Sequence, residues 1–266
     1  MTSAQPDAPR FSIITIGRND LAGLKVAAQS IASQTCQDLE WIVSDGASTD
    51  GSVEWLESAN LAYLDFISEP DNGIQDAYNK GIARATGEIL VFINSGDMFA
   101  SNETLALVDQ DQKMRGWLWA YGAMNVIDSD LNVIDVNNWQ NFSKWQLRMG
   151  LHSIGHQSAF FTHAVVSKVG LYRSEVGVQS DQDFMLRAAD LAEPAYIDAV
   201  LALLETGGVS SGLAPDAFVR KAQMIRQMDD RLLWGNTLAD SLVTSVLAAT
   251  KRVRHRIWLM RGGGSS

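Results

Sequence analysis

Hydrophobic residues toward the start of the chain fall into two alternating patterns. Short unbroken runs rich in β-branched residues are typical of buried strands, whereas apolar residues three or four positions apart indicate helices. Residues 72–87 have the helical spacing, at Ile74, Tyr78 and Ile82, and Gly87 would end that helix. Strands that alternate with helices predict an α/β fold with a mainly parallel sheet flanked by helices. The predicted strands are residues 11–16, 39–45, 61–68 and 88–94.

Beyond Phe99 this alternation loosens. Residues 180–191 keep a helical spacing, and their acidic first turn suits the positive N-terminal end of a helix. Further sheet or hairpin segments are predicted at 117–128 and 132–139, and a strand leading into a short helix at 155–172.

The last part of the chain differs from the rest. Two helical stretches flank Gly235 and Asn236, and the second of them sets Leu242, Val246 and Ala249 on one face. We therefore predict three parts: a polar leader over 1–10, a domain over 11–212 and a helical extension over 213–266.

Composition narrows the classes of function. The chain has 266 residues, a formal net charge of −10 and one cysteine, Cys36. The negative charge disfavours nucleic acid as a partner, but a small phosphorylated ligand fits if a divalent cation offsets the repulsion. One cysteine cannot form a disulfide within the chain, and residues 1–10 lack the apolar segment of a signal peptide. No apolar stretch reaches the roughly 18–20 residues of a membrane span, so we predict a cytoplasmic protein.

Polar side chains gather where the four predicted strands end. Ligands of parallel α/β sheets bind at the carboxyl ends of the strands. The convergence of these ends therefore predicts one crevice lined with aspartate and asparagine. The four ends are Thr15–Asn19, Asp45–Asp50, Glu69–Asn72 and Asn94–Asp97.

Two of these aspartates have both a chemical and a structural interpretation. Asp45 can accept hydrogen bonds from a nucleobase or a ribose hydroxyl, or it can cap the turn that follows. Asp97 can bind Mg²⁺ or Mn²⁺ with diphosphate oxygens and waters, or it can cap a helix that begins near Asn102. One carboxylate is enough for the first interpretation, because Mg²⁺ commonly uses one or two together with substrate phosphates.

The helix predicted at 180–191 offers a candidate base. Asp181 or Asp183 can act as a general base in a partly desolvated crevice, and pairing with the helix dipole is the structural alternative. His156 can bind phosphate or metal, or orient a substrate. A lone histidine in an apolar strand is, however, more often a satisfied core residue.

Six stretches in order resemble the inverting family-two glycosyltransferases, which have the GT-A fold and use nucleotide-sugar donors. Within that family the sequence is similar to the bacterial exopolysaccharide and colanic-acid-type branch. The resemblance covers roughly residues 11–212, and an ordered set is far more specific than any single motif. The stretches are "FSIITIGRN", "WIVSDGASTDGS", "SEPDNGIQDAYNKGIARATGEILVFINSGDMF", "GHQSAFF", "SDQDFMLR" and "GGVS".

The resemblance implies a role for each matching residue. "NSGD" occupies the place of the family's acidic metal motif, with Asn94 and Gly96 where many members have aspartates, and Asp97 kept as the ligand of Mn²⁺ or Mg²⁺. Asp181 matches the catalytic base, with Asp183 as the supporting acid and His156 beside them. The residues implied in binding the nucleotide or the donor are Thr15, Arg18, Asp45, Asp76, Asn79, Asn94 and Ser95.

The implied reaction is a single displacement with inversion. Asp181 takes a proton from an acceptor hydroxyl, whose oxygen attacks the anomeric carbon opposite the nucleoside diphosphate, while a metal at Asp97 stabilises the leaving group. The implied partners are a UDP- or GDP-sugar and a saccharide or lipid-linked acceptor.

The tail and two other classes of function stay open. A basic, aromatic segment at 251–261 can rest on anionic lipid at the inner face of the membrane, or pack on the domain or at an oligomer interface. A degenerate relative that holds a nucleotide sugar without transfer is favoured by the missing acids and opposed by Asp45, Asp97 and Asp181. A nucleotidyltransferase usually carries a glycine-rich loop after its first strand, and "ITIGRND" is not one.

Overall fold

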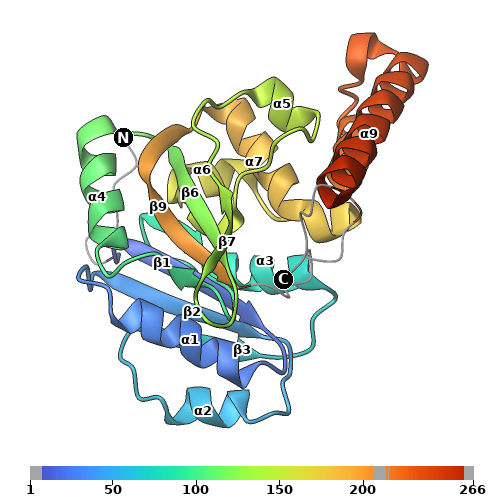
Figure 1. The fold of residues 1–266 in the computed structure, drawn as a ribbon. Helices are drawn as coiled ribbons and strands as arrows, with labels where there is room; N and C mark the ends of the chain where they lie inside the picture. Colours follow the sequence, from blue (N-terminus) through green and yellow to red (C-terminus); the bar gives the residue numbers. More distant parts are fainter. Residues whose placement is uncertain (1–7, 206–213, 215, 261–266) are drawn as a thin grey trace.

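The computed structural model describes residues 8–205, 214 and 216–260. Most of the predicted leader, the "GGVSSG" stretch at 207–212 and Arg261 of the basic tail lie outside the described residues. Figure 1 shows a twisted sheet with helices on both faces and a helical arm at one corner.

The four strands predicted for the first part of the chain form a parallel half-sheet. They lie in the order β3-β2-β1-β4, and β1 pairs in parallel with both β2 and β4. Along β1, Ile13 faces one hydrophobic core and Ile14 the other. Burial on both faces explains the continuous apolar runs, which are typical of inner parallel strands. The bounds are β1 (Phe11–Gly17), β2 (Leu39–Asp45), β3 (Leu64–Ser68) and β4 (Ile89–Phe92).

The second half of the sheet is mixed in direction. β8 runs antiparallel between β4 and β6, and β6 pairs in parallel with β9. β5 and β7 pair antiparallel with β9 and β6 respectively. The predicted parallel arrangement is therefore found in the first half of the sheet. The sequence does not show the direction of the other strands, because buried strands of either direction have similar apolar runs. The bounds are β5 (Met98–Phe99), β6 (Trp119–Ile127), β7 (Val133–Asn137), β8 (Ala159–Thr162) and β9 (Ala195–Glu205).

Helices cover both faces of the sheet. α1 packs on one face through Leu24 and Ile31, while α3 and α7 pack on the other through Tyr78 and Phe184. Asp20 caps α1 by accepting a hydrogen bond from the third residue of that helix. The bounds are α1 (Leu21–Ala32), α2 (Ser52–Ser58), α3 (Ile74–Arg84), α4 (Thr104–Arg115), α5 (Lys144–Arg148), α6 (His163–Val169) and α7 (Ser180–Leu191), with short 3₁₀ turns η1 (His156–Ser158) and η2 (Ser174–Gln179).

The end of α3 differs from the prediction. The helix stops at Arg84, and Ala85 already has an extended backbone with φ −67° and ψ 127°. Gly87 is therefore not the helix stop. A Cβ there would lie 2.6 Å from the Ser12 hydroxyl oxygen and 2.8 Å from the Phe11 carbonyl carbon, so close approach of two backbones requires glycine at this position.

The two helices predicted near the C-terminus form a hairpin that reaches away from the sheet (Figure 1). Arg226 and Asp240 join them through a buried ion pair of 2.8 Å. The predicted face with Leu242 and Val246 exists, but it is turned to solvent. None of the described helices is long and apolar enough to cross a membrane. The bounds are α8 (Ala217–Met228), η3 (Leu233–Gly235) and α9 (Thr237–Met260).

Candidate functional site

The loops that follow β1, β2 and β4 meet at the carboxyl edge of the parallel half-sheet. The Asn19 side-chain oxygen accepts a hydrogen bond from the Thr49 backbone N–H at 2.8 Å, which ties the first two loops together. The loop after β4 is tied to α1, because the Gly96 N–H donates to the Gly23 carbonyl at 3.0 Å. A narrow pocket at this junction, too tight to admit a water molecule, is lined by Gly17, Arg18, Asp45 and Ser95, among others.

Asp45 is buried at the end of β2 and holds the turn that follows it. Its carboxylate accepts hydrogen bonds from the Ser48 N–H at 2.9 Å, from the Ser48 hydroxyl, and from the Ser68 hydroxyl at 2.6 Å. Asp45 therefore caps the turn that follows β2, as one of its two interpretations predicted. Asp45 also lines this narrow pocket beside exposed Arg18.

Thr15 and Asn79, both expected at the nucleotide or donor, make contacts within the protein. The buried Thr15 hydroxyl donates to the Ile93 carbonyl at 2.6 Å and accepts from the Trp41 indole at 2.8 Å, which favours a role in the sheet over a nucleotide contact. Asn79 forms two hydrogen bonds with the backbone of Tyr172, at 2.7 and 3.0 Å. These contacts fasten α3 to the segment that leads into α7.

Asp76 stabilises the loop before α3. It accepts a hydrogen bond from the Asn72 N–H at 3.0 Å and pairs with Lys80 at 3.2 Å. The backbone hydrogen bond from Asn72, together with Lys80, lowers the pKa of Asp76. Lys80 also pairs with Glu69 and Asp71, so one lysine gathers the acids of the "EPDNG" loop.

Asp97 lies buried in the loop after β4, and the described helices exclude its alternative role as a helix cap. The nearest following helix, α4, has Glu103 at its N-cap position. The Asp97 carboxylate accepts a hydrogen bond from the Gln157 amide at 2.7 Å. Burial raises the pKa of Asp97 to about 7, against the opposing effect of Gln157.

Glu205 brings a second carboxylate to this loop. β5 pairs antiparallel with β9, with Met98 opposite Leu203, and this register sets the end of β9 beside Gly96. A Cβ on Gly96 would lie 3.7 Å from a Glu205 carboxylate oxygen. Glu205 also contributes to the raised pKa of Asp97. No sequence spacing predicts this neighbour, because Gly96 and Glu205 are more than a hundred positions apart in the chain.

The donor atoms at this loop suit a hard divalent cation. They are carboxylate oxygens, and Mg²⁺ or Mn²⁺ prefers oxygen ligands. Within residues 8–205, 214 and 216–260, no group of three or more His, Cys, Asp or Glu side chains is arranged to hold a metal ion. Asp97 and Glu205 are thus two carboxylates that the described residues bring to this loop.

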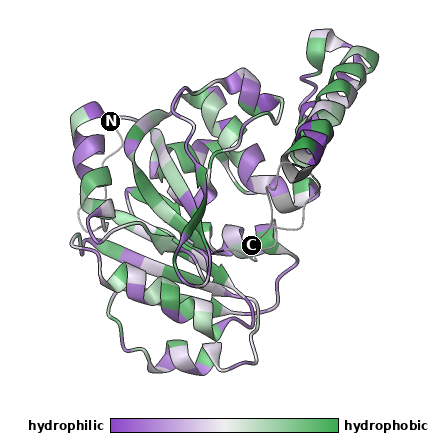
Figure 2. Cartoon of the chain, in the orientation of Figure 1, coloured by the Kyte–Doolittle hydropathy of each residue, from purple (hydrophilic) through white to green (hydrophobic). Residues whose placement is uncertain are grey.

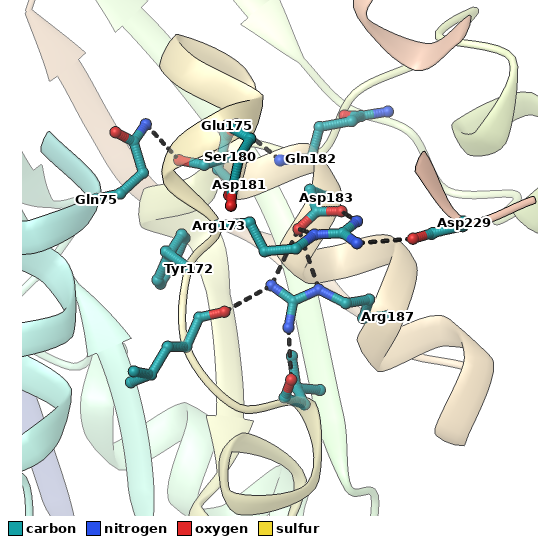
Figure 3. Close-up of polar contacts among 12 residues, drawn as sticks. Gln75, Tyr172, Arg173, Glu175, Ser180, Asp181, Gln182, Asp183, Arg187 and Asp229 are labelled. Atoms are coloured by element: carbon teal, nitrogen blue, oxygen red, sulfur yellow. Dashed lines mark hydrogen bonds and ion pairs between the residues drawn. The ribbon is translucent and has the colours of Figure 1, made fainter. Parts of the chain in front are cut away.

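The first turn of α7 carries two aspartates with different surroundings (Figure 3). Asp183 is fully buried between Arg173 and Arg187, both of which pair with its carboxylate. Arg173 also pairs with Asp229 at the end of α8, at 2.7 Å. Every oxygen of Asp183 is thus engaged in an ion pair, which gives this residue a structural role in positioning α7.

Asp181 has no ion pair among the described residues and is partly exposed. Its carboxylate accepts a hydrogen bond from the Gln182 backbone N–H at 2.7 Å. Burial raises the pKa of Asp181 to about 6. A carboxylate without a cationic partner and with a raised pKa is suited to accept a proton.

Tyr78 connects α3 to the loop after β4. Its hydroxyl donates to the Asn94 side chain at 3.1 Å. Burial raises the pKa of Tyr78, and the negative charges of Asp181 and Asp97 raise it further. Gln75, one turn earlier on α3, donates to the Ser180 hydroxyl at 3.1 Å, so α3 contacts both the first turn of α7 and the loop after β4.

His156 is a satisfied core residue. Its Nε2 forms a 2.6 Å hydrogen bond with the Tyr172 hydroxyl, and its ring stacks on Phe92 at 4.4 Å. Burial lowers the pKa of His156 to about 3, so the ring is neutral at physiological pH. This geometry argues against its predicted contact with phosphate as a cation.

Gln179, two residues before Asp181, was not singled out by sequence reasoning. Its amide nitrogen and oxygen are buried and have no hydrogen-bond partner among the described residues. The amide of Gln182, by contrast, donates to the Leu147 carbonyl at 2.8 Å. Both glutamines lie in the polar stretch where α7 begins. The sequence therefore does not show which of the two amides is hydrogen-bonded within the protein.

Comparison with known proteins identifies the family. Residues 12–118 match the model of "Glycosyl transferase family 2". The chain is 36% identical over 214 residues to an uncharacterized glycosyltransferase of Mycobacterium tuberculosis, covering 79% of this chain and 80% of that protein. It is 28% identical to a PGL/p-HBAD biosynthesis glycosyltransferase of Mycobacterium bovis, over 93% of this chain and 99% of that protein.

Solved structures share the fold at low sequence identity. Staphylococcus aureus TarS 1–349 in complex with UDP-GlcNAc matches with a TM-score of 0.64 and 17% identity, covering 82% of this chain. This chain spans 66% of that TarS segment. The mannosyltransferase PcManGT of Pyrobaculum calidifontis, in complex with GDP-Man and Mn²⁺, matches with a TM-score of 0.57 and 17% identity, covering 94% and 83% of the two chains.

Proposed function

Because the chain belongs to glycosyl transferase family 2, we propose that it transfers a sugar from a nucleoside-diphosphate sugar to a hydroxyl acceptor with inversion. The observation that carries the proposal is that α3 contacts both the turn of α7 that carries Asp181 and the loop that carries Asp97, so that two unlike acids lie at one edge of the sheet. Asp181 has no cationic partner, and burial raises its pKa to about 6. Asp97 lies on the opposite loop beside Glu205. One acid is suited to proton transfer and the other to a cation.

In the proposed reaction, Asp181 acts as the general base. Its carboxylate accepts the proton of the acceptor hydroxyl as the acceptor oxygen bonds to the anomeric carbon and the bond to the nucleoside diphosphate breaks. The burial that raises its pKa matches the base to a working pH near neutrality. Asp183 keeps α7 in place through Arg173 and Arg187, and so supports the base without touching the substrate.

Asp97, with Glu205 beside it, would hold the divalent cation. Such an ion supplies positive charge where the leaving diphosphate becomes more negative. Because two carboxylates give few protein ligands, we expect weak binding of Mn²⁺ alone and tighter binding when a nucleoside diphosphate adds its oxygens. Asn94 and Ser95 shape this loop, and Asn94 connects it to Tyr78.

The proposed donor is a UDP- or GDP-sugar that enters at the ends of β1 and β2. Arg18 and Asp45 line the pocket there, and exposed Arg18 is the nearby cation for phosphate or base. TarS in complex with UDP-GlcNAc and PcManGT in complex with GDP-Man support a nucleotide-sugar donor for this fold. Asp76 is proposed to act indirectly, by holding the loop that borders the donor.

The proposed acceptor is a saccharide or a lipid-linked saccharide, as in the exopolysaccharide branch that the sequence resembles. We propose residues 11–212 as the catalytic domain and 213–266 as an appended helical unit. The basic residues of 251–261 would bring the enzyme to the inner surface of the membrane, where lipid-linked acceptors lie.

Donor hydrolysis in the absence of an acceptor tests the proposal against a binding protein that holds a nucleotide sugar without transfer. A thermal-shift screen of UDP-, GDP- and dTDP-sugars with Mn²⁺ would first identify the donor, since a ligand at about 100 times its Kd adds roughly 2.7 kcal/mol. We expect slow release of the nucleoside diphosphate that needs Mn²⁺ or Mg²⁺ and is lost in Asp181→Asn. Donor binding without such release would favour the regulatory alternative.

A further inference from the structure

The helix α9 has two unlike faces. The inner face packs on α8 and includes Asp240, Thr244 and Ala248, all buried. The outer face is apolar and exposed: Leu238 is 82% and Leu242 67% exposed. Apolar residues recur along the arm in Figure 2, and the arm stands away from the sheet (Figure 1). The exposed apolar residues of this outer face are Leu238, Leu242, Val246, Val253 and Ile257.

The outer face is one continuous stripe with a positive border. At roughly 100° per residue, these apolar positions fall within an arc of roughly 100°. Exposed Arg252 and Arg256 lie toward one edge of the stripe, and exposed Arg254 lies beyond the other. Arg252 also pairs with Asp216 at the start of α8, at 3.1 Å.

Negative charge is absent from this face of the described helix. In 237–260 the only acidic residue is Asp240, and it is buried in its ion pair with Arg226. The whole chain carries a net charge of −10. A surface free of acids in so acidic a protein indicates a negatively charged partner.

The size of the stripe decides between a second copy of the chain and a lipid surface. α9 has 24 residues, and is therefore about 36 Å long at 1.5 Å per residue. With a face about 10 Å wide, it offers roughly 360 Å², well below the roughly 800 Å² per partner of a stable protein interface. An apolar stripe edged by arginines matches instead the helices that lie in the headgroup layer of a membrane.

We infer that the outer face of α9, from Leu238 to Ile257, binds an anionic lipid bilayer. This inference names the helix face that makes the membrane contact proposed above. It rests on the proposed function only for the reason the enzyme would bind a membrane, which is access to a lipid-linked acceptor. The apolar side chains enter the acyl boundary, while Arg252, Arg254 and Arg256 contact lipid phosphates.

Three ion pairs connect α9 to α7. Asp240 of α9 pairs with Arg226 of α8, and Asp229, which follows α8, pairs with Arg173. Arg173 in turn pairs with Asp183 on the same turn of α7 as Asp181. Binding of α9 to a membrane would therefore hold the first turn of α7 in a defined orientation toward the lipid surface.

Co-sedimentation with vesicles tests the inference. The probe is a mixture of phosphatidylglycerol and phosphatidylcholine, with pure phosphatidylcholine for comparison. The double variant Leu242→Asp with Val246→Asp removes apolar contact and adds negative charge, so its apparent affinity should fall about tenfold or more. The matched control is Met114→Asp, an equally exposed apolar residue on α4, which should bind like the wild type.

The outcomes separate the lipid surface from its alternatives. Binding to the anionic vesicles should weaken steeply from 0.05 to 0.5 M salt and be weak on phosphatidylcholine. Equal sedimentation of the double variant and the wild type would overturn the inference. So would a wild-type dimer in analytical ultracentrifugation that the double variant converts to monomer. The thermal shift with nucleotide sugar should be the same in all three proteins, so its absence would count against the proposed function and not against α9.

Discussion

Replacement of Asp181 by asparagine should remove activity and stabilise the protein at the same time. The carboxylate is partly exposed, has no ion pair among the described residues, and has a pKa raised by burial to about 6. A carboxylate kept ionised in such surroundings destabilises the folded state. Asparagine has nearly the same shape and carries no charge, so it removes both the base and the cost of its burial.

The size of the stability change follows from linkage. The pKa of Asp181 rises from 3.8 to about 6 on folding, and one unit corresponds to 1.36 kcal/mol. The folded state binds this proton more tightly than the unfolded state, so the contribution of Asp181 to stability declines as pH rises from about 4 to about 6. Above that window the cost is at most about 3 kcal/mol, and less because the side chain is partly exposed.

Denaturant unfolding at two pH values measures this effect. At pH 8, Asp181→Asn should unfold at a higher denaturant concentration than the wild type, while near pH 4 the two proteins should coincide. Asp183→Asn is the matched control, because the same substitution two residues away breaks a buried ion-pair cluster and should cost about 3–5 kcal/mol. A destabilised Asp181→Asn protein would refute the reasoning.

The kinetic half of the prediction uses donor hydrolysis or transfer. Loss of a general base lowers turnover by about 10²–10⁴-fold, while the thermal shift caused by the donor should persist. In the wild type, kcat/KM should decline as pH falls below about 6, because the base becomes protonated. Near-wild-type turnover in Asp181→Asn, or a rate independent of pH between 4.5 and 7, would remove Asp181 from the proposed role.

Three further predictions concern other parts of the chain. Gly87→Ala should lower stability by about 1–3 kcal/mol in chemical denaturation, because its Cβ would lie 2.8 Å from the backbone at Phe11; an unchanged midpoint would contradict the close approach. Calorimetry with Mn²⁺ and a nucleoside diphosphate should show no metal binding for Asp97→Asn and weaker binding for Glu205→Gln, and equal heats in all proteins would argue against a metal at this loop. Gln179→Met should raise stability by about 1–3 kcal/mol, because it removes a buried amide that has no hydrogen-bond partner among the described residues. Gln182→Met should lower stability. The opposite result, with Gln179→Met less stable than Gln182→Met, would show that the Gln179 amide has a hydrogen-bond partner.

The local pattern was sufficient for the elements of the first half of the fold. β1 and β2 form where unbroken apolar runs predicted them, and α7 spans 180–191 as its spacing indicated. Such runs reflect burial on both faces, a property that each strand carries in its own residues. The directions of β8 and β9 could not be predicted from the local pattern, because their pairing partners lie far apart in the chain.

The site divides in the same way. The polar residues at the strand ends were sufficient to predict where the loops meet. The resemblance to family-two glycosyltransferases added Asp181 and Asp97 as candidate site residues. Spacing did not separate Asp181 from Asp183, which differ by two positions on one helical turn. The difference arises from Arg173 and Arg187, which reach Asp183 alone.

Side-chain partners from distant segments account for the remaining differences. Thr15 and Asn79 have polar groups suited to a ligand, yet the fold supplies them with Ile93 and with the backbone of Tyr172. Glu205 has no motif around it, but the pairing of β5 with β9 sets it beside the loop that carries Asp97. The alternation of apolar and polar residues thus determined strands, helices and the edge of the sheet that carries the site. Which polar groups are engaged inside the protein, and which stay open to a substrate, depends on contacts across many residues, and only the tertiary structure decides it.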